Sequence, residues 1–145
     1  MIRKAKVNDL EKIVDLELKI FNESLGVSFL LNELKNKDSS NILVYELENT
    51  IIGYLSYRFN ENKAELLNFL IDSKYQTKGY GTKFFNFFIE DLKKREINSL
   101  ILEVRSKNLK AISFYKNYNY KLINTFKNHY KDDDALVLLI NIKDD

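Results

Sequence analysis

The order of apolar and polar positions predicts a chain that interleaves helices with strands. Stretches in which apolar residues recur every three or four positions indicate amphipathic helices, whereas short alternating or continuous apolar runs indicate strands. The sequence predicts helices at about residues 8–21, 28–36, 79–95 and 108–117. It predicts strands at about residues 2–6, 42–47, 51–57, 64–71, 99–105, 120–126 and 135–142.

Two of the predicted helices carry clear apolar stripes. Asn8, followed three positions later by Glu11, resembles a capping box and predicts the start of the first helix. The stripe of that helix comprises Leu10, Ile13, Val14, Leu18 and Phe21. The stripe of the third helix comprises Phe84, Phe88 and Leu92, with Phe85 and Ile89 beside it. We therefore expect both helices to pack against a sheet.

The predicted strands indicate the fold class. Glu48-Asn49 is a turn signal that joins two strands into a hairpin. The strand at 64–71 is almost continuously apolar, which predicts burial on both of its faces. The strand-helix-strand unit over residues 64–105 requires a right-handed crossover and hence a parallel pair. These features predict an α/β fold, with a mixed sheet of six to seven strands and helices on both faces.

The composition is that of a globular protein, and it gives no support for a membrane helix, a signal peptide or a nucleic-acid partner. A chain of 145 residues suits a single domain over residues 1–145, and 45% hydrophobic with 30% charged residues is ordinary for a globular protein. No apolar run approaches the roughly 18 residues of a membrane helix, and residues 1–6 are too polar for a signal peptide. We therefore expect a cytoplasmic protein with no membrane partner. The net charge of +2, with both signs interspersed, gives no support for a nucleic-acid partner.

The supply of reactive side chains is narrow. The chain has no cysteine, which excludes disulfides, zinc–thiolate sites and a cysteine acyl-enzyme. His129 is the single histidine, so neither a histidine-based triad nor a multi-histidine metal site is expected. We expect no metal cofactor, and any catalysis must use carboxylates, tyrosines, lysines or backbone groups.

A glycine-containing loop lies between the buried strand and the third helix. In Gln76-x-x-Gly79-x-Gly81 the two glycines let the backbone approach a ligand closely. The start of the helix offers unpaired N–H groups and the positive end of the helix dipole, which together suit a pyrophosphate. Thr82-Lys83 after Gly81 does not fit a Walker loop, and Phe84 stands where a dinucleotide fingerprint needs a third glycine. On the pattern alone, a tight strand-to-helix turn remains an alternative.

Several segments together resemble a known family. The loop 76–81 resembles the Q/R-x-x-G-x-G/A acetyl-CoA motif of the GNAT acetyltransferase superfamily. Residues 102–108, Leu-Glu-Val-Arg-Ser-Lys-Asn, resemble the L-E-V-R-x-x-N segment of its RimI-type ribosomal-protein alanine N-acetyltransferases. Ala111-Ile112 and Phe114-Tyr115 are similar to the A-I-x-L/F-Y that follows there. The resemblance covers residues 64–142 and implies the GNAT acyl-CoA N-acyltransferase fold, with acetyl-CoA as cosubstrate.

The resemblance also implies roles for individual residues. Glu103 would be the proton acceptor, Tyr115 the proton donor, and Asn108 a contact of the cofactor. Phe69, Leu70 and Ile71 would line the pantetheine and the acetyl group. Backbone amides would hold the pyrophosphate along Thr77, Lys78, Gly79, Tyr80, Gly81 and Thr82. Tyr130, in an Asn128-His129-Tyr130 segment that resembles an Asn-Tyr-Tyr segment of N-terminal acetyltransferases, would help to bind the acceptor.

Elementary chemistry is compatible with these two catalytic roles. A free α-amine has a pKa near roughly 8, so a carboxylate must take its proton before it attacks a thioester at neutral pH. Strand alternation places Glu103 with Ile101 and Arg105 on one face, so an ion pair with Arg105 on a solvated face is an alternative. Tyr115 lies seven residues after Asn108 and shares its side of a helix. A core aromatic residue is the alternative for Tyr115.

The acceptor is less well defined than the cofactor. Residues 21–24 read Phe-Asn-Glu-Ser where the family often has Phe-Pro-Trp-Ser/Thr, and residues 118–120 read Tyr-Asn-Tyr in place of Leu-Gly-Phe. Asn119 tolerates the left-handed conformation that this turn requires. The acidic loop 131–134 either attracts a cationic N-terminus or is a solvated turn. His129 is expected to be a surface or stacking residue.

The resemblance favours acetyl transfer to a protein N-terminal α-amine, and in particular to the N-terminal alanine of a small-subunit ribosomal protein. We expect a monomer or a weak dimer. Alternatives are a GNAT enzyme that acetylates a small amine or a lysine side chain, and an acyl-CoA-binding module without turnover. The presence of both Glu103 and Tyr115 argues against the binding module.

Overall fold

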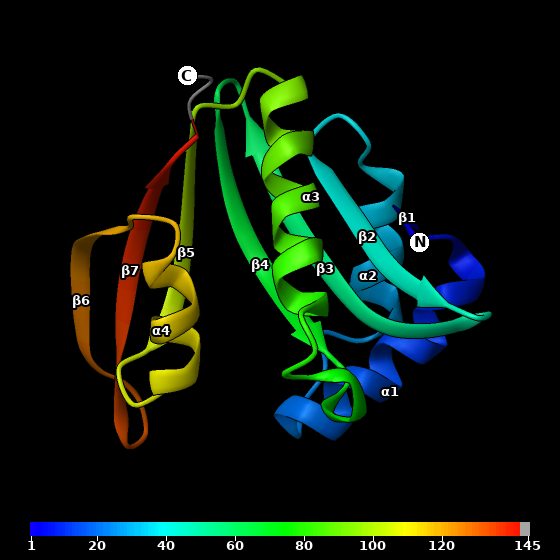
Figure 1. The fold of residues 1–145 in the computed structure, drawn as a ribbon, viewed down its shortest axis with the longest axis horizontal. Coiled ribbons are helices and arrows are strands. Elements are labelled where there is room, and N and C mark those ends of the chain that lie inside the picture. Colours follow the sequence, from blue (N-terminus) through cyan, green and yellow to red (C-terminus); the bar gives the residue numbers. More distant parts are fainter. Residues whose placement is uncertain (143–145) are drawn as a thin grey trace.

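The computed structural model describes residues 1–142, whose strands form one seven-stranded sheet in the order β1-β2-β3-β4-β5-β7-β6 (Figure 1). The strands are β1 (Ile2–Lys4), β2 (Ser40–Leu47), β3 (Thr50–Asn60), β4 (Lys63–Ile71), β5 (Ser99–Arg105), β6 (Lys121–Tyr130) and β7 (Asp133–Asn141). The helices are α1 (Leu10–Phe21), α2 (Val27–Lys35), α3 (Tyr80–Lys94) and α4 (Leu109–Lys116), with 3-10 turns at Val7–Asp9 and Ser73–Tyr75. The predicted mixed sheet and the order of its elements are confirmed. Several strands, most of all β3 and β6, are longer than predicted.

Helices α1 and α2 cover one face of the N-terminal strands (Figure 1). The predicted stripe of α1 is only partly right, because Leu18 is 48% exposed and Phe21 is 40% exposed. Leu16 and Glu17 take the buried positions of this turn instead. Glu17 is charged and nevertheless buried, and a pattern of apolar positions gives no signal for such a residue.

Helices α3 and α4 cover the opposite face, where the predicted α3 stripe is confirmed. Phe84, Phe85, Phe88 and Leu92 are fully buried. The ring of Phe85 lies 5.5 Å from the ring of Tyr115 and 4.7 Å from that of Tyr118, measured between centroids. These edge-to-face contacts fix α4, and with it Tyr115, against α3.

Two predicted turns use residues in the left-handed region. Glu48 and Asn49 have φ values of 47° and 66°, which suits a two-residue hairpin turn between β2 and β3. Asn119 has a φ of 53°, so asparagine takes the conformation expected of it between α4 and β6. The departure from Leu-Gly-Phe at this turn therefore leaves the fold intact.

The parallel pair predicted for β4 and β5 is present, but it is short. The two strands pair at only three positions, from Lys63 opposite Ser99 to Glu65 opposite Ile101. Beyond these positions they diverge, and the next neighbour of β5 is β7 rather than β6. The prediction that β4 is buried on both faces is wrong in its middle, where Leu66 to Phe69 are half-buried. These residues border the space that the divergence opens.

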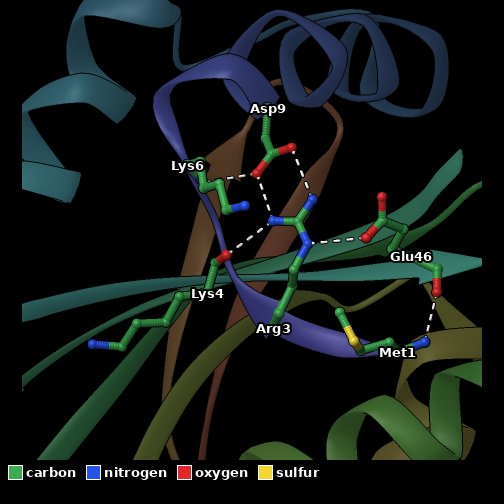
Figure 2. A network of polar contacts seen from close by, with 6 residues as sticks. All are labelled: Met1, Arg3, Lys4, Lys6, Asp9 and Glu46. Carbon is green, nitrogen blue, oxygen red and sulfur yellow. Dashed lines mark hydrogen bonds and ion pairs between the residues drawn. The ribbon is translucent and has the colours of Figure 1, made fainter. Parts of the chain in front are cut away.

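A polar network holds the N-terminus (Figure 2). The guanidinium of Arg3 donates to both carboxylate oxygens of Asp9, at 2.8 and 3.1 Å, and to Glu46 at 3.0 Å. The Asp9 carboxylate also accepts from the backbone N–H of Lys6 at 2.7 Å. The predicted start at Asn8 is wrong, because α1 begins at Leu10, after the 3-10 turn Val7–Asp9. The Asp9 carboxylate closes that turn on the backbone N–H of Lys6 and makes no side-chain cap to α1.

Within residues 1–142 no helix has both the length and the apolar character needed to cross a membrane.

Candidate active site

A first cavity of about 560 Å³ lies between the end of β4, the loop that follows it and α4. Its floor is the apolar run Phe69-Leu70-Ile71, which pairs with β3 on one side only, because β5 has already diverged. The other edge of this part of β4 therefore offers unpaired backbone N–H and C=O groups to a ligand.

The loop from β4 to α3 forms one end of this cavity. Gly79 is the residue before α3 and has a φ of 90°, a conformation that favours glycine. Thr77 has a φ of 62°, which is unusual for a β-branched residue and is typical of functional loops. Gly81 lines the cavity, and a Cβ built on it would have one neighbour, the Cγ1 atom of Ile71 at 3.9 Å. The loop thus leaves open space in front of the first N–H groups of α3.

Two side chains that the sequence did not single out as ligands close this end. Gln76 donates from Nε2 to the carbonyl oxygen of Ile71 at 2.8 Å. Its Oε1 accepts a hydrogen bond from Nζ of Lys110, on α4, at 2.7 Å. Among the described residues that line the first cavity, Lys110 is the one with a charged side chain. Lys110 follows Asn108, a predicted cofactor contact, by two residues, and this proximity was the signal in the sequence that could have identified it.

Asn108 combines a structural role with its predicted one. It is the N-cap of α4, and its Oδ1 accepts from the backbone N–H of Ala111 at 3.1 Å. The same side chain borders the first cavity. Its cap explains how a residue at the end of β5 is held rigidly beside the cavity.

Tyr115 lies at the junction of the first cavity with a second one, of about 510 Å³, and it lines both. Burial raises the pKa of its phenol well above the usual value, so the phenol remains protonated at neutral pH. No group within residues 1–142 forms a hydrogen bond with its hydroxyl. Tyr115 is therefore a packed aromatic residue whose protonated hydroxyl has no hydrogen-bond partner among the described residues.

The second cavity contains the predicted base. Glu103 projects from β5 into it, and its carboxylate accepts a hydrogen bond from the hydroxyl of Tyr130. Burial, aided by that hydrogen bond, raises the pKa of Tyr130 to about 12. The carboxylate is also 40% exposed at its side chain, so an amine or a water molecule can reach it.

The neighbours of Glu103 differ from the ion pair considered as an alternative. Arg105 places its guanidinium 3.8 Å from the ring centre of Tyr130 rather than against the carboxylate of Glu103. The ring of His129 stacks edge-on against Tyr130 at 5.0 Å, as expected of a stacking residue. Its Nε2 lies 3.9 Å from the carboxylate of Glu103. A cation–π contact and an aromatic contact thus hold Tyr130 over the base.

The carboxylates of the acidic loop after Tyr130 accept hydrogen bonds from other parts of the protein. The carboxylate of Asp133 accepts hydrogen bonds from the hydroxyl of Ser106 and, at 3.0 Å, from the backbone N–H of Lys107. Asp134 accepts from the backbone N–H of Asn128 at 2.8 Å. These bonds join the β6–β7 turn to the loop that carries Asn108, so this turn helps to position both Tyr130 and Asn108.

The structure brings most of the predicted residues to these two cavities. Those that line the first are Phe69, Leu70, Ile71, Thr77, Gly79, Gly81, Thr82, Asn108 and Tyr115. Glu103 and Tyr130 line the second. The side chains of Lys78 and Tyr80 line neither, and the ring of Tyr80 packs against Tyr45 at 5.5 Å. Their predicted contribution is through backbone amides, and it stays a prediction.

Residues 10–120 match the acetyltransferase (GNAT) family. The chain belongs to that family. A ribosomal protein bS18 alanine N-acetyltransferase of Haemophilus ducreyi is 30% identical over 110 residues, which cover 76% of this chain and 68% of that protein. An N-alpha-acetyltransferase of Saccharolobus solfataricus is 22% identical over 151 residues, covering 95% of this chain and 90% of that protein. The predicted GNAT membership of the RimI type is confirmed.

Solved structures show the same fold. The ribosomal-protein-alanine N-acetyltransferase of Escherichia coli superposes with a TM-score of 0.90 at 21% identity, covering 100% of this chain and 95% of that chain. The PaiA N-acetyltransferase of Thermoplasma acidophilum, solved in complex with coenzyme A, gives a TM-score of 0.83 at 22% identity, covering 97% and 98% of the two chains. The family binds acetyl-CoA.

The first cavity of this chain fits that cosubstrate. The glycines at its end leave room for a pyrophosphate before the positive end of the α3 dipole. The unpaired edge of β4 matches the amide groups of a pantetheine arm. Lys110 adds one positive charge to the cavity wall. This protein is thus an acetyl-CoA-dependent N-acetyltransferase with two cavities that meet at Tyr115.

Proposed function

We propose that this GNAT enzyme acetylates the N-terminal α-amine of a protein, and specifically the N-terminal alanine of a small-subunit ribosomal protein. The observation that carries the proposal is the meeting of the two cavities at Tyr115, with Glu103 and Tyr130 on the wall of the second. This arrangement gives a thioester and an amine separate entrances to one point. The names of the relatives in Haemophilus ducreyi and Saccharolobus solfataricus support the class of acceptor.

Bound acetyl-CoA supplies an acetyl group activated as a thioester. The carboxylate of Glu103 takes the proton that the acceptor ammonium must lose, directly or through one water molecule. The hydroxyl of Tyr130 holds that carboxylate in place. Tyr115 gives its phenolic proton to the sulfur as the carbon–sulfur bond breaks and the carbon–nitrogen bond forms. The second proton, which the nitrogen loses as it becomes an amide, returns to the phenolate of Tyr115 through water. The protein forms no covalent bond with the acetyl group, which suits a chain without cysteine.

The proposal is tested with a panel of acceptors and a colorimetric assay of CoA release. The panel contains peptides with a free N-terminal alanine, N-terminally blocked peptides with an internal lysine, and polyamines. We expect release with the free N-terminal peptides, and mass spectrometry should place the acetyl group on the α-amine. Release with polyamines or blocked peptides alone would show that the acceptor is a small amine or a lysine side chain. Tight acetyl-CoA binding without release from any acceptor would indicate a binding module.

A further inference from the structure

Glu17 is a buried carboxylate without a counter-ion. It lies on α1 with 1% of its surface exposed, and no cationic group within residues 1–142 pairs with it. Its oxygens accept hydrogen bonds from three uncharged donors: Ser24 at 2.7 Å, Tyr54 at 2.5 Å and Asn68 at 3.1 Å. Burying a charge raises the free energy of the folded state unless the charge is paired and hydrogen-bonded. A buried carboxylate with only neutral donors is therefore unusual and points to a function.

Three of the other buried carboxylates, those of Asp9, Glu33 and Asp72, have the counter-ion that Glu17 lacks. Glu33, on α2, is 4% exposed and accepts from the guanidinium of Arg58 at 2.7 Å. Asp72 pairs with Lys19 at 2.8 Å. Asp133, the remaining buried carboxylate, accepts from the hydroxyl of Ser106 and from backbone N–H groups, so Glu17 differs from it in having only side-chain donors.

The partners of Glu17 connect it to the second cavity. Asn68, on β4, lines that cavity, so a single side chain separates the Glu17 carboxylate from the cavity space. Ser24 directly follows Glu23, which also lines it, and the hydroxyl of Ser24 accepts from the backbone N–H of Gly26 at 2.9 Å. Glu17 thus holds two parts of the cavity wall, β4 and the segment between α1 and α2.

We infer that Glu17 is a positioning residue whose buried negative charge selects an acceptor amine that arrives as a cation. The inference rests on the proposed function, because it assigns the second cavity to the acceptor. A negative charge without a counter-ion, in an interior of low dielectric, attracts an ammonium group across one intervening side chain. The hydrogen bonds to Asn68 and Ser24 keep the wall in the shape that receives this ammonium group. The substrate class is therefore a primary amine that is protonated when it binds.

The test is Glu17→Gln, which keeps the shape of the side chain and removes its charge. We expect the KM for a free N-terminal peptide to rise about tenfold, with kcat within about twofold and the KM for acetyl-CoA unchanged. The matched control is Glu33→Gln, which removes the charge of an equally buried glutamate whose side chain lines neither cavity. This control should lower the urea midpoint of unfolding and leave the KM for the peptide unchanged.

A second measurement separates charge from shape. The N-acetylated peptide has the same chain as the acceptor but a neutral end, and its affinity can be measured by its inhibition of the reaction. We expect Glu17→Gln to weaken binding of the free-amine peptide about tenfold and to leave binding of the acetylated peptide unchanged. Equal weakening of both peptides, or of neither, would overturn the inference. A wild-type enzyme that acetylates no N-terminal peptide would instead refute the proposed function itself.

Discussion

The hydroxyl of Tyr115 lies where the two cavities meet, and the aromatic cluster around Phe85 fixes its position. Burial raises the pKa of this phenol, so it carries its proton throughout the neutral range and has a proton to give to the leaving sulfur. Glu103 differs from it in exposure and has access to water as well as to the second cavity. In the proposed mechanism Tyr115 therefore gives a proton to the leaving sulfur, and Glu103 takes one from the acceptor amine.

Replacing Tyr115 with phenylalanine tests the proton donor. The ring and its packing remain, so we expect kcat to fall about a hundredfold while the KM for acetyl-CoA stays nearly constant. Steady-state kinetics of CoA release give both values. Tyr118→Phe is the matched control, because its ring also contacts Phe85 while its side chain lines neither cavity. Unchanged turnover in Tyr115→Phe would remove the proton-donor role.

Replacing Glu103 with glutamine tests the base. At pH 7 most of the acceptor α-amine is protonated, so we expect kcat to fall about a hundredfold. As the pH rises through the pKa of the amine, near roughly 8, free amine becomes available and the variant should recover much of its rate. The pH–rate profile over pH 6.5–9.5 is the measurement. A variant with the wild-type profile would place the base elsewhere.

At the scale of elements, the divergence of β4 from β5 opens the first cavity. A glycine on the neighbouring strand β3 leaves room for the path that β4 follows. Gly53, on β3, lies opposite Ile71. A Cβ on Gly53 would come within 2.7 Å of both the carbonyl oxygen of Leu70 and the Cδ1 atom of Ile71. The absence of a side chain at this position therefore sets the path of the strand that floors the first cavity.

Gly53→Ala should accordingly disturb both stability and cofactor binding. Because one of the two close neighbours is backbone, β4 must move, and we expect a loss of about 2 kcal/mol in the free energy of unfolding. The KM for acetyl-CoA should rise as Leu70 and Ile71 shift. Urea unfolding and kinetics measure the two effects. Gly81→Ala is the control for stability, since its Cβ would meet Ile71 only at 3.9 Å.

The junction of β1 with α1 depends on the bidentate pair of Arg3 and Asp9 (Figure 2). The hydrogen bonds from Arg3 outweigh partial burial and hold the pKa of the Asp9 carboxyl below its usual range. A lowered folded-state pKa means that the stabilisation is complete above the unfolded pKa, near roughly 3.9. It is lost as the pH falls through the lower folded pKa.

Asp9→Asn should therefore destabilise the protein in a pH-dependent way. We expect a loss of about 2 kcal/mol in the free energy of unfolding at pH 7, which shrinks below about pH 4 as the wild-type carboxyl becomes neutral too. Urea titrations at several pH values measure it. Asp15→Asn, at an exposed position of α1, should change stability little at any pH. A loss that is independent of pH would contradict the role of the Arg3 pair.

At the scale of the whole molecule, the sheet consists of two parts joined by little main-chain pairing. One part is β1 to β4 and the other is β5, β7 and β6. Helix α3 lies over β3 and β4 and connects β4 to β5 along the chain (Figure 1). The hydrogen bond from Lys110 to Gln76 links α4 of the second part to the loop that follows β4. The first cavity lies between the two parts and is lined by residues from both.

Lys110→Gln tests the contribution of the second part to cofactor binding. Removing this positive charge from the cavity wall should weaken acetyl-CoA binding about tenfold, with a smaller effect at high salt. Isothermal titration with acetyl-CoA at two ionic strengths measures both effects. Lys116→Gln removes a charge from the same helix at an exposed position that lines neither cavity, and it should bind as the wild type does. Equal affinities of the two variants would show that Lys110 only bridges to Gln76.

The sequence by itself determined the elements, their order, the parallel crossover and the family. These follow from local patterns: period-3.6 stripes such as that of α3, positive-φ turn residues such as Asn119, and contiguous motifs from Gln76 to Tyr115. The same contiguity explains why most residues that line the first cavity could be named in advance. They lie in the strand, loop and helices that follow one another along the chain.

Only the tertiary structure decided how distant segments complete the site. The apolar pattern gives no signal for the burial of Glu17, which depends on hydrogen bonds from Tyr54 and Asn68, far from it in sequence. The bridge from Lys110 to Gln76 and the use of the acidic loop by Ser106 and Lys107 also join separate segments. Periodicity reports which face of an element is apolar, but it carries no information about which remote polar group will satisfy a buried one. That choice is made when the sheet and its helices pack together.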